Sequence, residues 1–113
     1  MQNSFIVSIS ANTMGNGSEE LGKILIKAYI NTLTELESPP EAILFYNSGA
    51  HLTSTESNTI DDLKTLESKG TKILTCGTCI NYYNLQEKLA VGKITTMTEI
   101  SKTLATTPKV INI

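Results

Sequence analysis

The sequence predicts an α/β fold with a mainly parallel sheet, and two observations carry that prediction. Short apolar runs rich in β-branched residues alternate along the chain with longer segments that have helical periodicity. Glycines, prolines and polar clusters separate these segments, and no internal repeat or low-complexity stretch interrupts them. Because crossovers between parallel strands are right-handed, we expect helices on both faces of the sheet.

Five runs are predicted as strands because they are apolar, β-branched and bounded by turn residues. They cover residues 5–10, 41–47, 71–75, part of 90–95, and 109–113. Each run is too short for a helix of ordinary length, and helical segments separate consecutive runs. This order favours parallel pairing in one sheet.

The longest predicted helix covers residues 19–36. Ser18 precedes it as the N-cap, glutamates occupy its first turn, and Pro39 marks its end. We expect its core-facing stripe to consist of Leu21, Ile24, Leu25, Ala28, Thr32 and Leu36, which recur at helical spacing.

Three further helices are predicted. One covers residues 58–69 and is capped by Gly70, a short one covers residues 79–88, and the last ends at Pro108. Their apolar stripes are Ile60, Leu63 and Leu66 in the first, and Met97, Ile100 and Leu104 in the last.

The composition bounds the classes of function. A chain of 113 residues fits one domain, which we place at residues 1–113. Its net charge is -2 and it has no basic stripe, so nucleic acid is not an expected partner. No apolar run approaches the roughly 20 residues of a membrane span, and the start of the chain lacks a signal-peptide pattern. We therefore expect a cytoplasmic protein that contacts no membrane.

Both cysteines lie in one turn, Cys76-Gly-Thr-Cys79, directly after the predicted strand at residues 71–75. A helix is predicted to open there, and thiols near a helix amino end are favoured as thiolate, the reactive form. In a cytoplasmic chain this spacing is more often redox, sulfur-handling or metal-binding than a structural disulfide. We therefore expect Cys76 and Cys79 to be catalytic, with the lower pKa at Cys76.

Ligand sites in parallel sheets lie beyond the carboxyl ends of the strands. Three predicted loops, residues 12–17, 47–57 and 76–79, follow strands and therefore share that edge. Within the second of them, residues 51–57 are expected to form a polar loop. The residues expected to line a crevice around the thiols are Asn12, Met14, Gly15, Asn47, Ser48, Gly49, Gly77 and Thr78.

Other interpretations of these residues stay open. The cysteines either do chemistry or pack as small hydrophobic residues. A structural zinc site needs about four protein ligands, so two thiols and His51 would require a second subunit. His51, the single histidine, is either a general base near the thiols or a solvated loop residue. The loop at residues 12–18 is either an anion cradle or a turn that caps a helix.

Several segments recur in order along most of the chain: Asn12-Thr-Met-Gly15, residues 20–25, Phe45-Tyr-Asn-Ser-Gly49, residues 70–75, Cys76-Gly-Thr-Cys79, Tyr83, residues 88–92 and Met97. Together they resemble the DsrE/DsrF-like family, and most closely the carboxyl-terminal domain of YedF-type proteins linked to selenium metabolism. The resemblance implies a three-layer α/β/α domain with a five-stranded parallel sheet. It also implies a sulfur or selenium carrier in which Cys76, after the third strand, holds a persulfide. Cys79 resembles the second cysteine of the YedF-type branch.

Two features depart from the family pattern. The small sulfur-carrier domain that usually precedes a YedF-type domain is not in this sequence, so we expect a stand-alone version or a fragment. Ala50 and His51 stand where the family has an aliphatic residue and a lysine, so the resemblance assigns no role to that loop.

The sequence thus predicts a sulfurtransferase-like carrier without a cofactor or metal. Cys76 takes a sulfane sulfur or selenium atom from a donor, and Cys79 releases it by closing a disulfide. Donors and acceptors are proteins or small thiols, and the wider family leads us to expect a homo-oligomer. Two alternatives remain, a dithiol–disulfide redox protein and a non-enzymatic metal-binding or assembly module.

Overall fold

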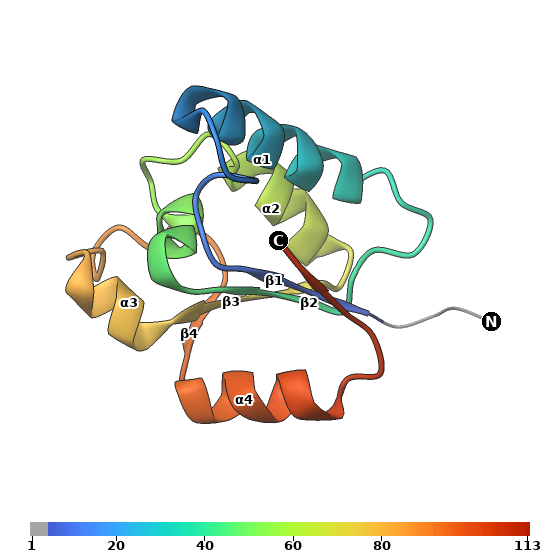
Figure 1. Ribbon diagram of the computed structural model, residues 1–113. Coiled ribbons are helices and arrows are strands. Elements are labelled where there is room, and N and C mark those ends of the chain that lie inside the picture. Colours follow the sequence, from blue (N-terminus) through green and yellow to red (C-terminus); the bar gives the residue numbers. More distant parts are fainter. Residues whose placement is uncertain (1–4) are drawn as a thin grey trace.

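The computed structural model describes residues 5–113 and contains one five-stranded sheet (Figure 1). The strands are β1 (Ile6–Ile9), β2 (Ala42–Phe45), β3 (Lys72–Cys76), β4 (Lys93–Thr95) and β5 (Val110–Asn112). They pair in the order β4-β3-β2-β1-β5, and every pair is parallel. The predicted α/β class is therefore confirmed.

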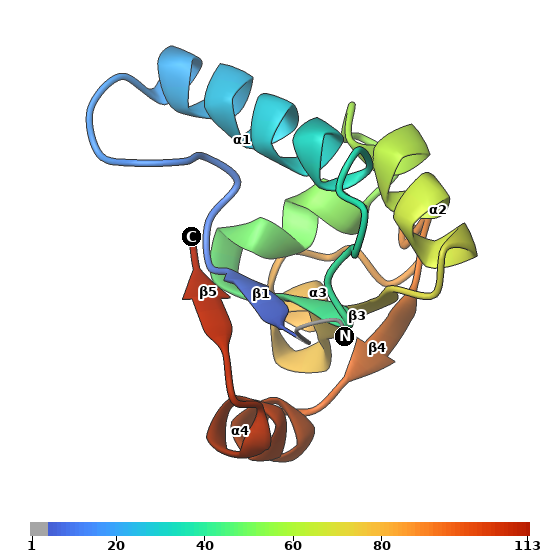
Figure 2. The same cartoon turned by 90° about the vertical axis from the view of Figure 1, so that its right-hand side faces the viewer.

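Helices cover both faces of this sheet and give three layers (Figures 1 and 2). The helices are α1 (Glu19–Leu33), α2 (Ile60–Ser68), α3 (Gly77–Tyr82) and α4 (Met97–Thr106), with a 3₁₀ helix η1 (Asn47–Thr53) after β2. Helices α1 and α2 lie on one face, and α4 lies on the other. This arrangement is the three-layer sandwich that the family resemblance implies.

The core follows from the alternation of side chains along the strands. Strands β1 and β2 are buried at every position, as expected for central strands of a parallel sheet. Successive residues face opposite layers, so Ile43 packs in the cluster under α1 and α2 while Leu44 packs with Ile100 of α4. The two layers of the core therefore share the same strands.

The strand register brings three loops to one edge of the sheet. Ile9 pairs with Phe45, and Phe45 pairs with Thr75, so β1, β2 and β3 end side by side. The segments that follow these strands begin at that shared edge. The structure thus confirms the common edge expected for the loops at 12–17, 47–57 and 76–79.

Two predicted helix boundaries have a clear local cause. Ser18 Oγ accepts a hydrogen bond from the Leu21 N–H at 3.2 Å, which confirms the N-cap of α1. At the end of α2, Gly70 has φ 102°, and its N–H donates to the Glu67 carbonyl. The Thr71 N–H donates to the Leu66 carbonyl, which completes a Schellman cap.

The predicted core stripe of α1 is wrong. The buried residues of this helix are Gly22, Ile26, Ile30 and Leu33. Leu21 and Ile24 of the predicted stripe are 52% and 61% exposed. Because α1 carries apolar residues at helical spacing on two faces, periodicity alone does not identify the face that meets the sheet. Contact with the sheet selects the Ile26 face and leaves the other one outside.

Three smaller predictions also need correction. The polar loop expected at residues 51–57 begins inside η1, whose Ala50 and Leu52 are buried. Helix α3 starts at Gly77 and ends at Tyr82, earlier at both ends than the predicted 79–88. Met97 is 52% exposed at the start of α4 and is not part of its buried stripe.

Among residues 5–113, no helix is long and apolar enough to cross a membrane. The predicted domain at residues 1–113 includes four residues that lie outside the described part of the chain.

Candidate functional site

Cys76 is the last residue of β3 and the N-cap residue of α3. It is only 2% exposed and packs in the cluster of Leu44 and Ile100 on the α4 face of the sheet. Both cysteines are free thiols. The strand therefore delivers Cys76 to the edge where ligand sites form in parallel sheets, as the sequence predicts.

Hydrogen bonds favour the thiolate form of Cys76. Burial disfavours that charge, but hydrogen bonds from the backbone and side chains of Cys79 and Thr78 outweigh burial and lower the pKa of Cys76 below the ordinary thiol value. The lowered pKa makes Cys76 the stronger candidate for the thiolate of the pair.

Cys79 lies one turn into α3 and is partly exposed. Its Sγ accepts a hydrogen bond from the backbone N–H of Asn47 at 3.0 Å. Burial and the neighbouring Cys76 raise the pKa of Cys79 despite that hydrogen bond. Cys76 therefore loses its proton more readily than Cys79 does.

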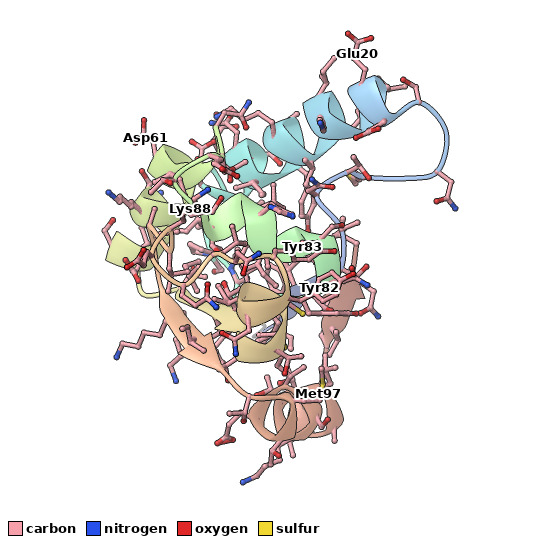
Figure 3. The ribbon with its side chains drawn as sticks, turned by 90° about the vertical axis from the view of Figure 1, so that its left-hand side faces the viewer. Glu20, Asp61, Tyr82, Tyr83, Lys88 and Met97 are labelled. Atoms are coloured by element: carbon pink, nitrogen blue, oxygen red, sulfur yellow. The ribbon has the colours of Figure 1, made fainter. Side chains whose placement is uncertain are left out.

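A cavity of about 440 Å³ opens beside Cys79. It is lined by Tyr46, Asn47, Thr78, Cys79, Tyr82, Tyr83 and Met97. Figure 3 shows Tyr82 and Tyr83 at the end of α3 and Met97 at the start of α4, on the same side of the molecule. Tyrosine rings and a thioether dominate this wall, and none of the lining residues carries a lysine, arginine or carboxylate group. Its surface suits a polarisable, weakly hydrated ligand atom such as sulfur.

Asn47 connects this cavity to η1. It adopts φ 53°, a conformation uncommon outside glycine, at the junction of β2 and η1. Its Oδ1 accepts a hydrogen bond from the Tyr83 hydroxyl at 3.0 Å. The Tyr83 ring packs on His51, with 4.4 Å between ring centroids, and edge-to-face on Tyr82 at 5.1 Å. Asn47 is therefore held from both its backbone and its side chain.

The structure brings some of the predicted crevice residues together at this cavity. Asn47 and Thr78 line it with Cys79, and Gly77 links the two cysteines next to it. Gly49 packs so closely on the Ile9 carbonyl that a side chain there would overlap it. Gly49 therefore lets η1 pack against the end of β1, and it does not line the cavity.

Other predicted crevice residues lie elsewhere. Ser48 Oγ accepts a hydrogen bond from the Asn12 N–H at 3.2 Å, which ties the loop after β1 to η1. Met14 packs against the core under α1, and Gly15 lies in an exposed turn. Asn12 and His51 line a second cavity of about 420 Å³ together with Lys23. His51 therefore lines the second cavity, and its ring packs on Tyr83 of the thiol cavity.

Sequence reasoning did not place Tyr46, Tyr82, Tyr83 or Met97 at the site. Helical spacing offers a signal for two of them, because Tyr82 and Tyr83 follow Cys79 by three and four residues and so share its side of a helix. Tyr46 and Met97 come from other elements, and only the fold brings them to the thiols.

Within residues 5–113, no group of three or more histidine, cysteine or acidic side chains is arranged to hold a metal ion. In the described part of one chain, the thiol pair therefore has no third ligand of these types.

Comparison with known proteins shows the fold. No family model matches the sequence, and no curated protein matches it. The YchN protein from E. coli aligns over 100% of both chains with a TM-score of 0.72 and 19% identity. MTH1491 from Methanobacterium thermoautotrophicum, a protein of unknown function, aligns over 99% of this chain and 100% of its own, with a TM-score of 0.71 and 16% identity. BT1422 from Bacteroides thetaiotaomicron, also of unknown function, covers 96% and 94% with a TM-score of 0.64 and 10% identity. At these identities the likeness establishes a shared α/β fold and nothing about activity.

Proposed function

We propose that the protein is a sulfur or selenium carrier of the type that the DsrE/YedF-like resemblance implies, with Cys76 holding the cargo atom. The observation that carries the proposal is the pair of free thiols at the carboxyl edge of the sheet, with a lowered pKa at Cys76, beside a cavity whose lining residues carry no formal charge. A lowered pKa at Cys76 supplies the nucleophile, and the cavity supplies the space for a donor.

Loading is a thiolate exchange. The Cys76 thiolate attacks the terminal sulfur of a donor persulfide, R–S–SH. A new S–S bond forms at Cys76 Sγ, the S–S bond of the donor breaks, and the donor leaves as its thiolate. A perselenide donor follows the same step with selenium as the terminal atom. Cys76 is 2% exposed and packs in a cluster that Cys79 contacts, so we propose that the donor approaches through the cavity that Cys79 lines.

Unloading has two routes. An acceptor thiolate attacks the terminal sulfur and leaves the Cys76 thiolate behind. In the absence of an acceptor, the Cys79 thiolate attacks Cys76 Sγ, the bond to the terminal sulfur breaks, and hydrosulfide leaves as the Cys76–Cys79 disulfide forms. A dithiol reductant of the cell then returns both thiols by a two-electron reduction.

The donors and acceptors in this proposal are proteins or small thiols that reach the cavity beside Cys79. We propose a cytoplasmic location, because reducing compartments keep a free thiol pair reduced.

A second candidate function is dithiol–disulfide exchange without cargo. The observation that favours it is that Cys79 packs against the cluster that contains Cys76 and that both thiols are free. In this case the pair cycles between dithiol and disulfide and never holds a terminal sulfur.

Peptide mass spectrometry separates the two functions. Reduced protein is incubated with a persulfide donor, the donor is removed, and the peptide that contains both cysteines is weighed. In the Cys79→Ser chain a carrier gains the mass of one sulfur atom, whereas an exchange protein keeps the mass of its reduced peptide. We expect Cys76→Ser to abolish loading and Cys79→Ser to let the loaded form accumulate. Loading that depends on Cys79 alone would reverse the two roles.

A further inference from the structure

The backbone of Asn47 adopts a conformation that needs support. A φ of 53° is costly for a residue with a side chain, although asparagine tolerates it better than most. Such conformations persist where the surrounding structure holds them, and they cluster at functional sites. Here the Tyr83 hydroxyl donates to Asn47 Oδ1 at 3.0 Å and fixes the side chain from across the cavity.

The backbone N–H of the same residue points at Cys79. The N–H donates to Cys79 Sγ at 3.0 Å, although the two residues are 32 positions apart in the sequence. Tyr83 is tied back to Cys79 as well, because its N–H donates to the Cys79 carbonyl at 3.1 Å. Asn47, Tyr83 and Cys79 thus form a closed ring of three hydrogen bonds around the partly exposed thiol.

Two aromatic contacts hold Tyr83 itself. His51 packs on its ring from η1, and Tyr82 packs on its edge from α3. The hydroxyl is therefore fixed by packing and does not depend on the hydrogen bond to Asn47 for its direction.

We propose that Asn47 and Tyr83 are positioning residues that hold the Cys79 sulfur in place for its attack on sulfur-loaded Cys76. The inference rests on the proposed carrier function and assigns its release step. In that step Cys79 S⁻ bonds to Cys76 Sγ, the bond from Cys76 Sγ to the terminal sulfur breaks, and HS⁻ leaves with the negative charge. A dithiol reductant later reduces the resulting disulfide.

The chemistry of the cavity explains why Cys79 needs a hydrogen-bond donor. Its lining residues carry no lysine or arginine to stabilise a negative charge on Cys79. The titratable groups along it are Cys79 itself and three tyrosine hydroxyls, with Cys76 beyond Cys79 and His51 behind Tyr83. The Asn47 N–H is the backbone donor that supports the Cys79 thiolate.

The test measures Cys79 by itself. In a Cys76→Ser background, the rate of Cys79 alkylation by iodoacetamide is followed against pH. Tyr83→Phe removes the hydroxyl that holds Asn47 and keeps the ring. We expect it to move the profile to higher pH and to slow alkylation at pH 7 by about three- to tenfold, since one weakened hydrogen bond lowers the thiolate fraction by that order. Tyr29→Phe, which removes a tyrosine hydroxyl from α1 outside the cavity lining, is the matched control, and it should leave the profile unchanged.

A second pair of variants tests the backbone. Asn47→Gly accepts a positive φ without strain, whereas Asn47→Ala does not. We expect alkylation of Cys79 to be slower in Asn47→Ala than in Asn47→Gly, with both folded by circular dichroism. Equal profiles for Tyr83→Phe and Tyr29→Phe, together with equal profiles for the two Asn47 variants, would overturn the positioning role.

Hydrosulfide release distinguishes this inference from the carrier function. In the chain with both cysteines, Tyr83→Phe should load sulfur normally and release hydrosulfide three- to tenfold more slowly. Loading and release at parent rates would overturn the inference and leave the carrier function intact. If the unsubstituted protein does not load sulfur but Tyr83→Phe still shifts the alkylation profile of Cys79, the carrier function is overturned. The positioning of Cys79 by Asn47 and Tyr83 then still stands.

Discussion

Two cysteines separated by two residues have opposite surroundings. Cys76 is buried, and its neighbours Cys79 and Thr78 lower its pKa, whereas Cys79 borders the cavity and receives a hydrogen bond from Asn47. The group with the more stable thiolate is thus the less accessible one. In the proposed carrier function, this division would let Cys76 hold the cargo away from water while Cys79 controls its departure.

The pH dependence of alkylation follows from these surroundings. Because the pKa of Cys76 is lowered, its thiolate and hence its alkylation persist to lower pH than those of an ordinary thiol. The pKa of Cys79 is raised, so its alkylation is lost sooner than that of an ordinary thiol as the pH is lowered. Alkylation resolved by peptide mass spectrometry gives the two midpoints. The pH midpoints are compared because burial slows the alkylation of Cys76 at every pH. A higher midpoint at Cys76 than at Cys79 would contradict the assignment of Cys76 as the thiol with the lower pKa.

The sequence identified the thiols but only part of their surroundings. Cys76 and Cys79 are recognisable as candidate reactive thiols because they are separated by two residues and come directly after a predicted strand. The contact of Tyr83 with Asn47 spans 36 positions and depends on how η1 and α3 sit at the sheet edge. No local pattern contains that information. The sequence therefore predicts the reactive atoms better than the groups that position them.

Among the secondary-structure elements, the strands were the most predictable from sequence. Their β-branched runs have one arrangement that buries them, in the centre of a parallel sheet. Helix η1 was missed because its sequence, Asn-Ser-Gly-Ala-His-Leu-Thr, has no helical repeat. Its burial comes from Ala50 and Leu52, which pack in clusters formed by other elements. Such an element exists because of its neighbours and not because of its own sequence.

The turn that leads into β4 offers a test of strand packing. Gly92 has φ 77°, and a side chain there would overlap the Ile73 carbonyl of β3. We expect Gly92→Ala to lower the free energy of unfolding by about 2–5 kcal/mol, since a left-handed conformation and an overlap both oppose it. Urea unfolding gives the value.

Gly70 is the matched control for that substitution. It also has a positive φ, 102°, but nothing lies within 4 Å of a side chain placed there. Gly70→Ala should cost about 1–2 kcal/mol from backbone strain alone. Equal losses of unfolding free energy at Gly92 and Gly70 would show that the overlap with Ile73 of β3 adds nothing to the cost of a side chain at Gly92.

At the scale of the whole molecule, α1 has two apolar faces and the fold uses one. Leu21, Ile24 and Leu25 are exposed along one side of the helix at spacings of three and four residues. Apolar side chains in such a row are typical of a surface that another chain covers. A second copy of this chain is the partner expected from the sequence.

Sedimentation tests that expectation. We expect the protein to be a dimer or larger at micromolar concentration, and Ile24→Glu to shift it toward monomer, because a charge at the centre of the apolar row opposes its burial. Ser101→Glu adds the same charge to an exposed position of α4 and should leave the assembly unchanged. A parent protein that sediments only as a monomer would count against self-association.

The central claim is that Cys76 holds a sulfur atom that Cys79 can release. The most direct measurement is the mass of the peptide containing both cysteines in the Cys79→Ser variant, after exposure to a persulfide donor and removal of excess reagent. The account predicts a stable gain of one sulfur atom that disappears when a thiol acceptor is added. An unchanged mass in Cys79→Ser, with only a disulfide forming in the parent chain, would contradict it.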